Sequence, residues 1–355
     1  MATHASCVPS SFFPSSCYAS IRGGRRSTAA AAAAAATLPP NPTSHLCFGS
    51  STSLRPKNSS SATTQRHDSS ASAAASAVKS EDSKPIELTY LEGNSWLWDV
   101  EGLNILVDPI LVGNLDFGLP WLFEGAKKVL GNFRMVGRQL DDLPSLDCLL
   151  ITQSLDDHCH VKTLTPLSKK MPDLPVIATP NAEAILRPLF SNVTYLEPGQ
   201  KSVLEGKNGT NIQICATKGP ILGPPWQRPE NGYIIKFGQS NLTLYHEPHC
   251  VYDKSFVENY QADILITPVI KQLLPLFTLV SGQEDAVQLA KLLKAKYIVP
   301  MNNGDLNAKG ILSRILYSEG TIESFKELLS KELPDAQVLE PKPGIPLEIS
   351  VSTIS

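Results

Sequence analysis

The stretch of sequence that decides the fold is Leu149-Leu-Ile-Thr-Gln-Ser-Leu-Asp-Asp-His-Cys-His160. It overlaps an almost continuous apolar run over residues 146–152, which has the length and composition of a buried strand. Carboxylates and imidazoles follow at residues 156–160, and residues 161–170 then show the pattern of a helix. The stretch therefore predicts a buried strand, a short polar loop and a helix. Loops at the ends of core strands are where a rigid scaffold holds reactive groups.

A second loop of this kind, His246-Glu-Pro-His249, follows the strand expected at residues 241–245. The chain has seven histidines, and the four that follow residue 80 all lie in these two loops. Nitrogen and carboxylate ligands alternating within a few residues suit a transition metal such as zinc. The alternative is that the imidazoles are hydrogen-bonded loop residues that fix turns. From spacing alone both interpretations stay open.

Short apolar runs separated by turn signals make up most of the remaining sequence after residue 85. Further strands are expected at residues 86–91, 95–98, 103–108, 175–178, 202–204, 211–216, 232–237, 263–267, 297–301 and 336–339, and further helices at 181–189, 281–294 and 320–333. Strands come first, and mixed strands and helices follow, which fits an α/β chain with two packed sheets and helices outside them. No glycine-rich turn follows the first strand, so a doubly wound nucleotide fold is not indicated.

Residues 1–80 have the composition of a plastid transit peptide. They are rich in Ser, Ala, Thr and Pro, and six basic residues precede the first acidic residue, Asp68. A plastid is favoured over a mitochondrion because arginines are few and no amphipathic helix is evident. We therefore expect a disordered leader over residues 1–80, a folded domain over residues 86–350 and a location in the chloroplast stroma.

The charge and the cysteines of the expected domain limit its partners. The whole chain has a net charge of −3 and residues 1–80 have +6, which leaves −9 for the rest. An acidic domain is a poor partner for nucleic acid, so a small-molecule ligand or substrate is expected. The four cysteines after residue 80 form no CxxC pair, and no segment has the roughly 20 apolar residues of a transmembrane helix. The oligomeric state is left open.

The order and spacing of five pieces resemble the metallo-β-lactamase superfamily, in particular its lactonase-like and ribonuclease Z-like members. The central piece, residues 149–158, resembles the metal signature His-x-His-x-Asp-His, which follows a strand and precedes a helix. The other four resemble further strands of the family: residues 103–109, 231–235, 242–247 and 298–303. The resemblance covers nearly all of the expected domain and implies a four-layer αββα sandwich. Residues 103–109 would then end in the family's supporting aspartate, Asp108.

The sequence departs from the family's ligand pattern at the first metal position. Gln153 and Leu155 stand in place of the two leading histidines, and no histidine occurs in residues 216–231, where the third ligand would fall. Asn302 or Asn303 stands where the last metal-binding histidine is expected. The two-metal site of the family is therefore not encoded, and the motif is degenerate.

Asp157 and His158 match the family's signature directly, and in the family these two residues serve the second metal. The resemblance therefore implies a rearranged site for one divalent metal, most simply zinc, with Asp157 and His158 also taking part in catalysis. His160, Glu247 and His249 are the expected additional ligands, with Glu247 in place of the bridging aspartate. His246 is a further candidate.

Two residues are expected to contact the substrate. These are Arg228, in a proline-rich loop, and Asn303, at the position of the family's last ligand.

The family resemblance implies metal-dependent hydrolysis of an ester, lactone or phosphate-type bond. Two alternatives remain at this point. The fold could bind a small ligand or partner without catalysis and without metal, as a pseudoenzyme. Or His158 or His249 could act as a general base without metal, oriented by Asp157 or Glu247. A nuclease of the ribonuclease Z type fits less well, because the domain is acidic and the histidines are missing.

Overall fold

The quoted stretch forms strand β4 (Cys148–Ile151), whose four residues are all buried. Helix α1 (Val161–Lys170) follows it, as the pattern predicted. The structure is a computed structural model that describes residues 86–125, 140–206, 209–221, 226–275, 277–302 and 307–350. The predicted leader lies outside these residues. No helix in the described ranges combines the length and the apolarity needed to cross a bilayer.

The strand β4 lies within a seven-stranded sheet of order β17-β1-β2-β3-β4-β5-β6. The other strands of this first sheet are β1 (Ile86–Tyr90), β2 (Trp96–Val100), β3 (Leu103–Val107), β5 (Val176–Ala178), β6 (Val193–Tyr195) and β17 (Pro346–Ile349). From β3 to β6 the pairing is parallel, so the carboxyl ends of β3 and β4 lie side by side. The turn between β2 and β3 is the predicted Glu101-Gly102, and both residues have positive φ, as a tight hairpin turn requires.

A second seven-stranded sheet has the order β16-β14-β11-β10-β9-β8-β7. Its strands are β7 (Lys201–Glu205), β8 (Asn211–Lys218), β9 (Asn231–Phe237), β10 (Thr243–His246), β11 (Ile264–Pro268), β14 (Tyr297–Met301) and β16 (Gln337–Val338). The sequence predicted all seven, each within a few residues of its observed bounds. It did not predict the small three-stranded sheet of β12 (Lys271–Leu274), β13 (Phe277–Val280) and β15 (Tyr317–Glu319), whose strands are short and partly exposed.

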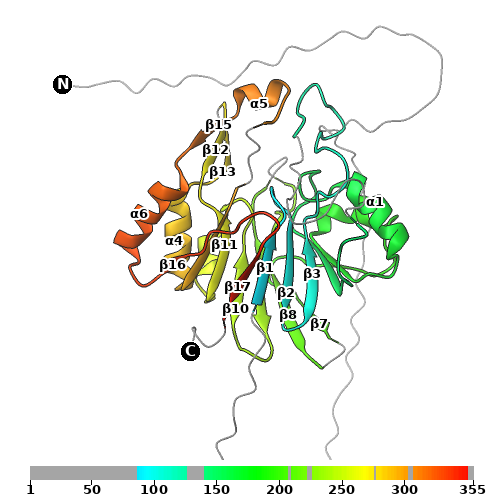
Figure 1. The fold of residues 1–355 in the computed structure, drawn as a ribbon, viewed down its shortest axis with the longest axis horizontal. Coiled ribbons are helices and arrows are strands. Elements are labelled where there is room, and N and C mark those ends of the chain that lie inside the picture. The colour runs from blue at the N-terminus through cyan, green and yellow to red at the C-terminus, as the bar shows by residue number, and fades with distance from the viewer. Residues whose placement is uncertain are drawn as a thin grey trace, which may run out of the picture. The chain divides into compact units, whose positions relative to one another are not determined.

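Helices cover the outer faces of the two large sheets (Figure 1). The helix α1 packs on the first sheet, together with a short 3₁₀ turn (Pro180–Ala182) and α2 (Glu183–Leu186), which replace the longer helix predicted at residues 181–189. The second sheet carries α4 (Gln283–Leu293) and α6 (Ile322–Glu332). Two short helices, α3 (Lys254–Val257) and α5 (Ile311–Ile315), complete the elements.

Three apolar clusters separate the four layers. One lies between the sheets and includes Trp96, Trp98 and Tyr233, and each outer cluster lies between one sheet and its helices. The predicted four-layer αββα arrangement is therefore confirmed.

Candidate metal site

The site begins where β3 and β4 end. Asp108 directly follows β3, and Thr152 directly follows β4. Asp108 is fully buried and has a φ of 42°, a left-handed conformation that is uncommon for a residue with a side chain. The backbone N–H of Thr152 donates to Asp108 Oδ1 at 2.8 Å, and its hydroxyl donates to Oδ2. These bonds fix the carboxylate at the carboxyl edge of the sheet.

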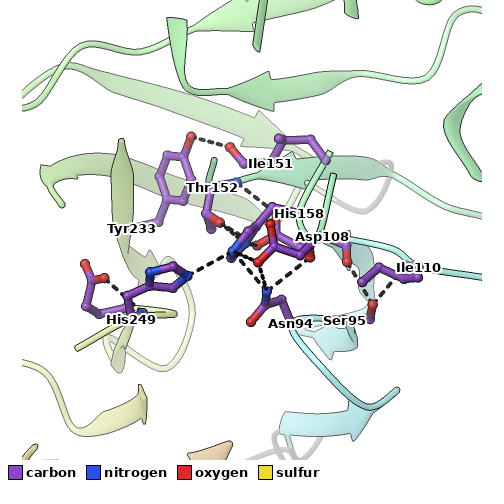
Figure 2. Close-up of polar contacts among 11 residues, drawn as sticks. Asn94, Ser95, Asp108, Ile110, Ile151, Thr152, His158, Tyr233 and His249 are labelled. Atoms are coloured by element: carbon purple, nitrogen blue, oxygen red, sulfur yellow. Dashed lines mark hydrogen bonds and ion pairs between the residues drawn. The ribbon is translucent and has the colours of Figure 1, made fainter. Parts of the chain in front are cut away.

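Asp108 in turn orients His158. The Nδ1 atom of His158 lies 2.7 Å from Asp108 Oδ2 and 2.9 Å from Thr152 Oγ1. Figure 2 shows the ring held between this pair and the residues on its other side. A carboxylate on one ring nitrogen leaves the other, Nε2, to face a ligand, which is the usual arrangement behind a metal-binding histidine.

Three residues from different parts of the chain surround His158 Nε2. The Asn94 Nδ2 atom lies at 2.9 Å, the His249 Nε2 atom at 3.2 Å and the Asp157 Oδ2 atom at 3.4 Å. Asn94 Nδ2 also donates to the Asp157 backbone carbonyl at 3.1 Å. The turn between β1 and β2, the loop after β4 and the loop after β10 thus meet at one point.

Asp157, His158 and His249 each offer one ligand atom to this point, and the three atoms lie within 4.8 Å of one another. Zinc bonds of about 2.0–2.1 Å, arranged tetrahedrally, separate ligand atoms by about 3.3–3.4 Å. The 3.2 Å and 3.4 Å separations from His158 Nε2 match two edges of such a tetrahedron. Asp157 Oδ1 is buried and has no hydrogen bond with any described residue. Two imidazoles and a carboxylate with an uncommitted oxygen fit a divalent transition metal.

The charges at the site support the same conclusion. Burial alone would lower the pKa of His158, but the Asp157 and Asp108 carboxylates raise it to about 10. Burial and the charge on His158 lower the pKa of His249 to about 3, so its ring is neutral. Burial would raise the pKa of Asp157, but the charge on His158 holds it below its usual value. Without metal, a proton on His158 balances the carboxylates, and a cation that displaced it would take over that role.

Three of the predicted ligands, His160, His246 and Glu247, lie outside this group of three residues. His160 is buried at the start of α1, and its Nδ1 lies 2.9 Å from Thr163 Oγ1. His246 points into the layer between the sheets, where its ring packs edge-on against Trp98 with the ring centroids 5.4 Å apart. Burial and the charge on His158 lower the pKa of His246 to about 3.

Glu247 supports His249 through the backbone of the same loop. Its Oε1 accepts a hydrogen bond from the His249 backbone N–H at 3.3 Å, and its Oε2 lies 3.4 Å from the Tyr245 hydroxyl. Burial raises the pKa of Glu247 to about 8. A Cβ at Gly232 would come within 2.5 Å of Glu247 Oε2, so glycine makes the room for this side chain. The structure brings His249, and not Glu247, to the group formed by Asp157 and His158.

The predicted substrate contact Arg228 is not part of this group. The Arg228 side chain is 61% exposed and forms an ion pair with Glu197 at 3.3 Å. Asn303 lies outside the described residues. Gln153 is fully buried, and the Leu155 side chain is exposed.

Sequence reasoning missed Asn94, although the Glu92-Gly93-Asn94 turn could have marked the loop that holds it. Glu92 and Gly93 both have positive φ, which turns the chain back toward the end of β4.

A family model described as a beta-lactamase superfamily domain matches residues 87–302. The chain belongs to this family. The match includes both histidine loops, and the beta-lactamase superfamily assignment accounts for the sandwich. No protein with a curated description matches the chain.

Solved structures with the superfamily's fold resemble this chain at low identity. A metallo hydrolase of the hyperthermophilic archaeon Ignicoccus hospitalis has a TM-score of 0.51 and 18% identity, over 75% of this chain and 99% of that one. An isothiocyanate hydrolase from Delia radicum gut bacteria gives the same four values. CmlA, a diiron β-hydroxylase from Streptomyces venezuelae, has a TM-score of 0.52 and 16% identity over 75% of this chain and 54% of its own. At these identities the similarity establishes the fold alone.

Proposed function

We propose that this protein is a hydrolase that uses one divalent metal, held by Asp157, His158 and His249. The observation that carries the proposal is the convergence of these three ligand atoms within 4.8 Å, from two loops about 90 residues apart in sequence. Zinc is the ion that the two nitrogens, one oxygen and near-tetrahedral spacing favour. The missing histidines at the first metal position support a site with one metal in place of two.

A bound divalent ion would supply Lewis acidity, which activates water and polarises a carbonyl or phosphoryl oxygen. Asp108 and Thr152 hold the His158 ring so that Nε2 faces the site. Asp157 presents Oδ2 to the ligand group, while its Oδ1 is uncommitted and can accept a proton or orient a water molecule. Asn94 fixes the backbone of Asp157 and thereby the direction of the carboxylate.

An ester, lactone or phosphate-type bond in a small molecule is the proposed target. The net charge of −9 outside residues 1–80 disfavours a polyanionic substrate such as nucleic acid. The composition of residues 1–80 supports action in the chloroplast stroma. Import of a fusion of these residues to a fluorescent protein into isolated chloroplasts tests the location separately from the chemistry.

Metal analysis of the purified protein tests the metal directly. We expect about one zinc, iron or manganese ion per chain after loading, and loss of that ion in Asp157→Asn and His249→Leu. His246→Leu is the matched control, because it removes a buried imidazole from the same loop without touching the three-residue group. Fewer than about 0.1 metal ions per chain in the wild type, after incubation with each of the three ions, would contradict the proposal.

A further inference from the structure

Glu230 carries a buried carboxylate that the proposed metal site does not use. The residue is fully buried just before β9. Its Oε1 accepts a hydrogen bond from the Ser154 hydroxyl at 2.7 Å, and its Oε2 has no hydrogen bond with any described residue. No Lys or Arg in the described ranges forms an ion pair with it. Glu230 Oε2 is therefore a buried carboxylate oxygen without a hydrogen-bond partner among the described residues.

Two further buried polar side chains near Glu230 also lack partners among the described residues. They are Gln153, through both atoms of its amide, and Thr179, through its hydroxyl. The backbone of Gln153 is fixed beside Glu230, because Asn231 N–H donates to the Thr152 carbonyl on one side of it and Ser154 contacts Glu230 on the other. Burial raises the pKa of the Glu230 carboxyl, whereas the Ser154 and Thr179 hydroxyls and the Asn181 amide lie close enough to lower it.

The carboxylate is not needed to hold the Glu230 backbone. The Gly219 N–H donates to the Glu230 carbonyl at 2.8 Å, and the Glu230 N–H donates to the Pro220 carbonyl at 2.8 Å. A Cβ at Gly219 would come within 2.9 Å of that carbonyl oxygen, so the two segments approach as closely as they can. These backbone hydrogen bonds hold the Glu230 backbone in place. The unpaired carboxylate oxygen is therefore not needed for the fold of this segment.

Buried polar atoms in native proteins almost always have partners, and an unpaired buried carboxylate is among the costliest exceptions. The unpaired atoms here are mainly acceptors: Glu230 Oε2, Gln153 Oε1 and Asn231 Oδ1 only accept, the Thr179 hydroxyl can do both, and Gln153 Nε2 donates. Acceptors that outnumber donors favour a group that donates several hydrogen bonds, and a carboxylate among them favours a positively charged group.

We infer that Glu230, Gln153 and Thr179 bind the ammonium group of a small-molecule substrate. The inference rests on the proposed function, because it places this group beside the metal-binding residues. Thr152 joins the two places: its hydroxyl contacts His158 Nδ1, and its carbonyl accepts from Asn231, the neighbour of Glu230. Within the cluster, Gln153 stands at the position at which the superfamily resemblance puts the first histidine of the metal signature. A substrate cation would then occupy the space of a metal cation.

The test uses the full chain and two probes, ethylammonium chloride and tetramethylammonium chloride, at equal ionic strength. Both cations have one charge, but only ethylammonium donates hydrogen bonds. At about ten times its dissociation constant, ethylammonium should raise the thermal midpoint of the wild type by roughly 2–4 °C. Tetramethylammonium should not raise it, and Glu230→Gln should abolish the ethylammonium shift. Glu197→Gln is the matched control and should retain it, because Glu197 is a surface acid of the same region.

Metal content measured on the same samples separates this inference from the proposed function. If metal binds but ethylammonium shifts neither protein, or shifts wild type and Glu230→Gln equally, the cluster holds only buried water and the inference is overturned. If ethylammonium binds through Glu230 but no metal binds, the inference stands and the hydrolase proposal fails. With both intact, a p-nitrophenyl ester carrying a primary ammonium on its acyl chain should be hydrolysed about tenfold or more faster than its uncharged analogue. That preference should be lost in Glu230→Gln.

Discussion

The two histidine loops hold their ligands in opposite ways. His158 has partners at both ring nitrogens, with Asp108 and Thr152 behind it and Asn94 in front. His249 is anchored through its backbone, by Glu247 Oε1 and by the Ser281 N–H, and its Nδ1 has no hydrogen bond within the described ranges. The His158 ring is thus held by several side chains without metal, whereas the His249 ring contacts one side chain, His158 Nε2 at 3.2 Å, and is positioned mainly through its backbone.

The largest expected effect is the loss of support behind His158. Asp108→Ala should reduce the free energy of unfolding of the metal-free protein by about 3–5 kcal/mol, because it leaves a protonated, buried imidazole with one carboxylate fewer. Urea unfolding measures this. Asp141→Ala removes a surface ion pair with Lys170 and should change stability by less than about 0.5 kcal/mol. Equal losses in the two variants would mean that the Asp108 contact adds nothing.

His249 should show the reverse behaviour. His249→Leu should weaken zinc binding at least about 100-fold, because a ligand is lost. It should reduce the metal-free stability by only about 1 kcal/mol, because the imidazole loses a single side-chain contact, with His158 Nε2 at 3.2 Å, and an apolar group fills the buried space. Competition with a chromophoric chelator and urea unfolding give the two values. The matched variant His246→Leu should keep the zinc affinity, and a comparable loss there would contradict the assigned ligand set.

The two histidines should also give opposite pH dependence to the metal-free protein. The pKa of His249, about 3, lies below its unfolded value, so its stabilisation is present above about pH 6.5 and is lost as pH falls toward 3. The pKa of His158 in the folded protein, about 10, lies above the value in the unfolded chain. The stabilisation from His158 is therefore present below about pH 6.5 and is lost as pH rises toward 10. Between pH 6.5 and 5, His249→Leu should lose roughly 1.5 kcal/mol less stability than the wild type.

Urea midpoints at pH 5, 6.5 and 8 decide this prediction. His158→Gln should flatten the alkaline side of the stability profile, and His249→Leu should flatten the acid side. Identical slopes in the two variants would count against the protonation states assigned to the two rings.

The smallest expected effect lies at Glu247. Glu247→Gln keeps an oxygen for the His249 backbone N–H and should weaken zinc binding by less than about fivefold, because positioning is only partly disturbed. Chelator competition measures the difference. A loss as large as that of His249→Leu would mean that Glu247 binds the metal itself.

The fold could be predicted from local patterns because its strands are short, buried and bounded by clear turns. β4 and the residues after it were found for this reason, and Asp157 and His158 lie so near the strand end that their placement follows from it. The small sheet of β12, β13 and β15 was missed because its partly exposed residues give no continuous apolar run.

The second half of the site could not be predicted in the same way. Which residue of His246-Glu-Pro-His249 faces His158 depends on how the loop turns, and that turn includes a left-handed Cys250 with a φ of 53°. Asn94 reaches the site from a hairpin 64 residues before His158. Such a contact depends on how the strands pack, and no local spacing encodes it.

The Tyr233 hydroxyl links the two large sheets directly beneath the site. It donates to the Ile151 carbonyl at 3.0 Å (Figure 2). Tyr233 is also the partner of His246 in the pairing of β9 with β10. His158 follows one of the linked sheets and His249 follows the other, so an ion held by both would bridge the two halves of the sandwich. Separation of the two sheets would draw His158 and His249 apart and would therefore favour release of the ion. The rate of metal release would then report how often the two sheets separate. Tyr233→Phe removes the hydroxyl that links the sheets and should raise that rate.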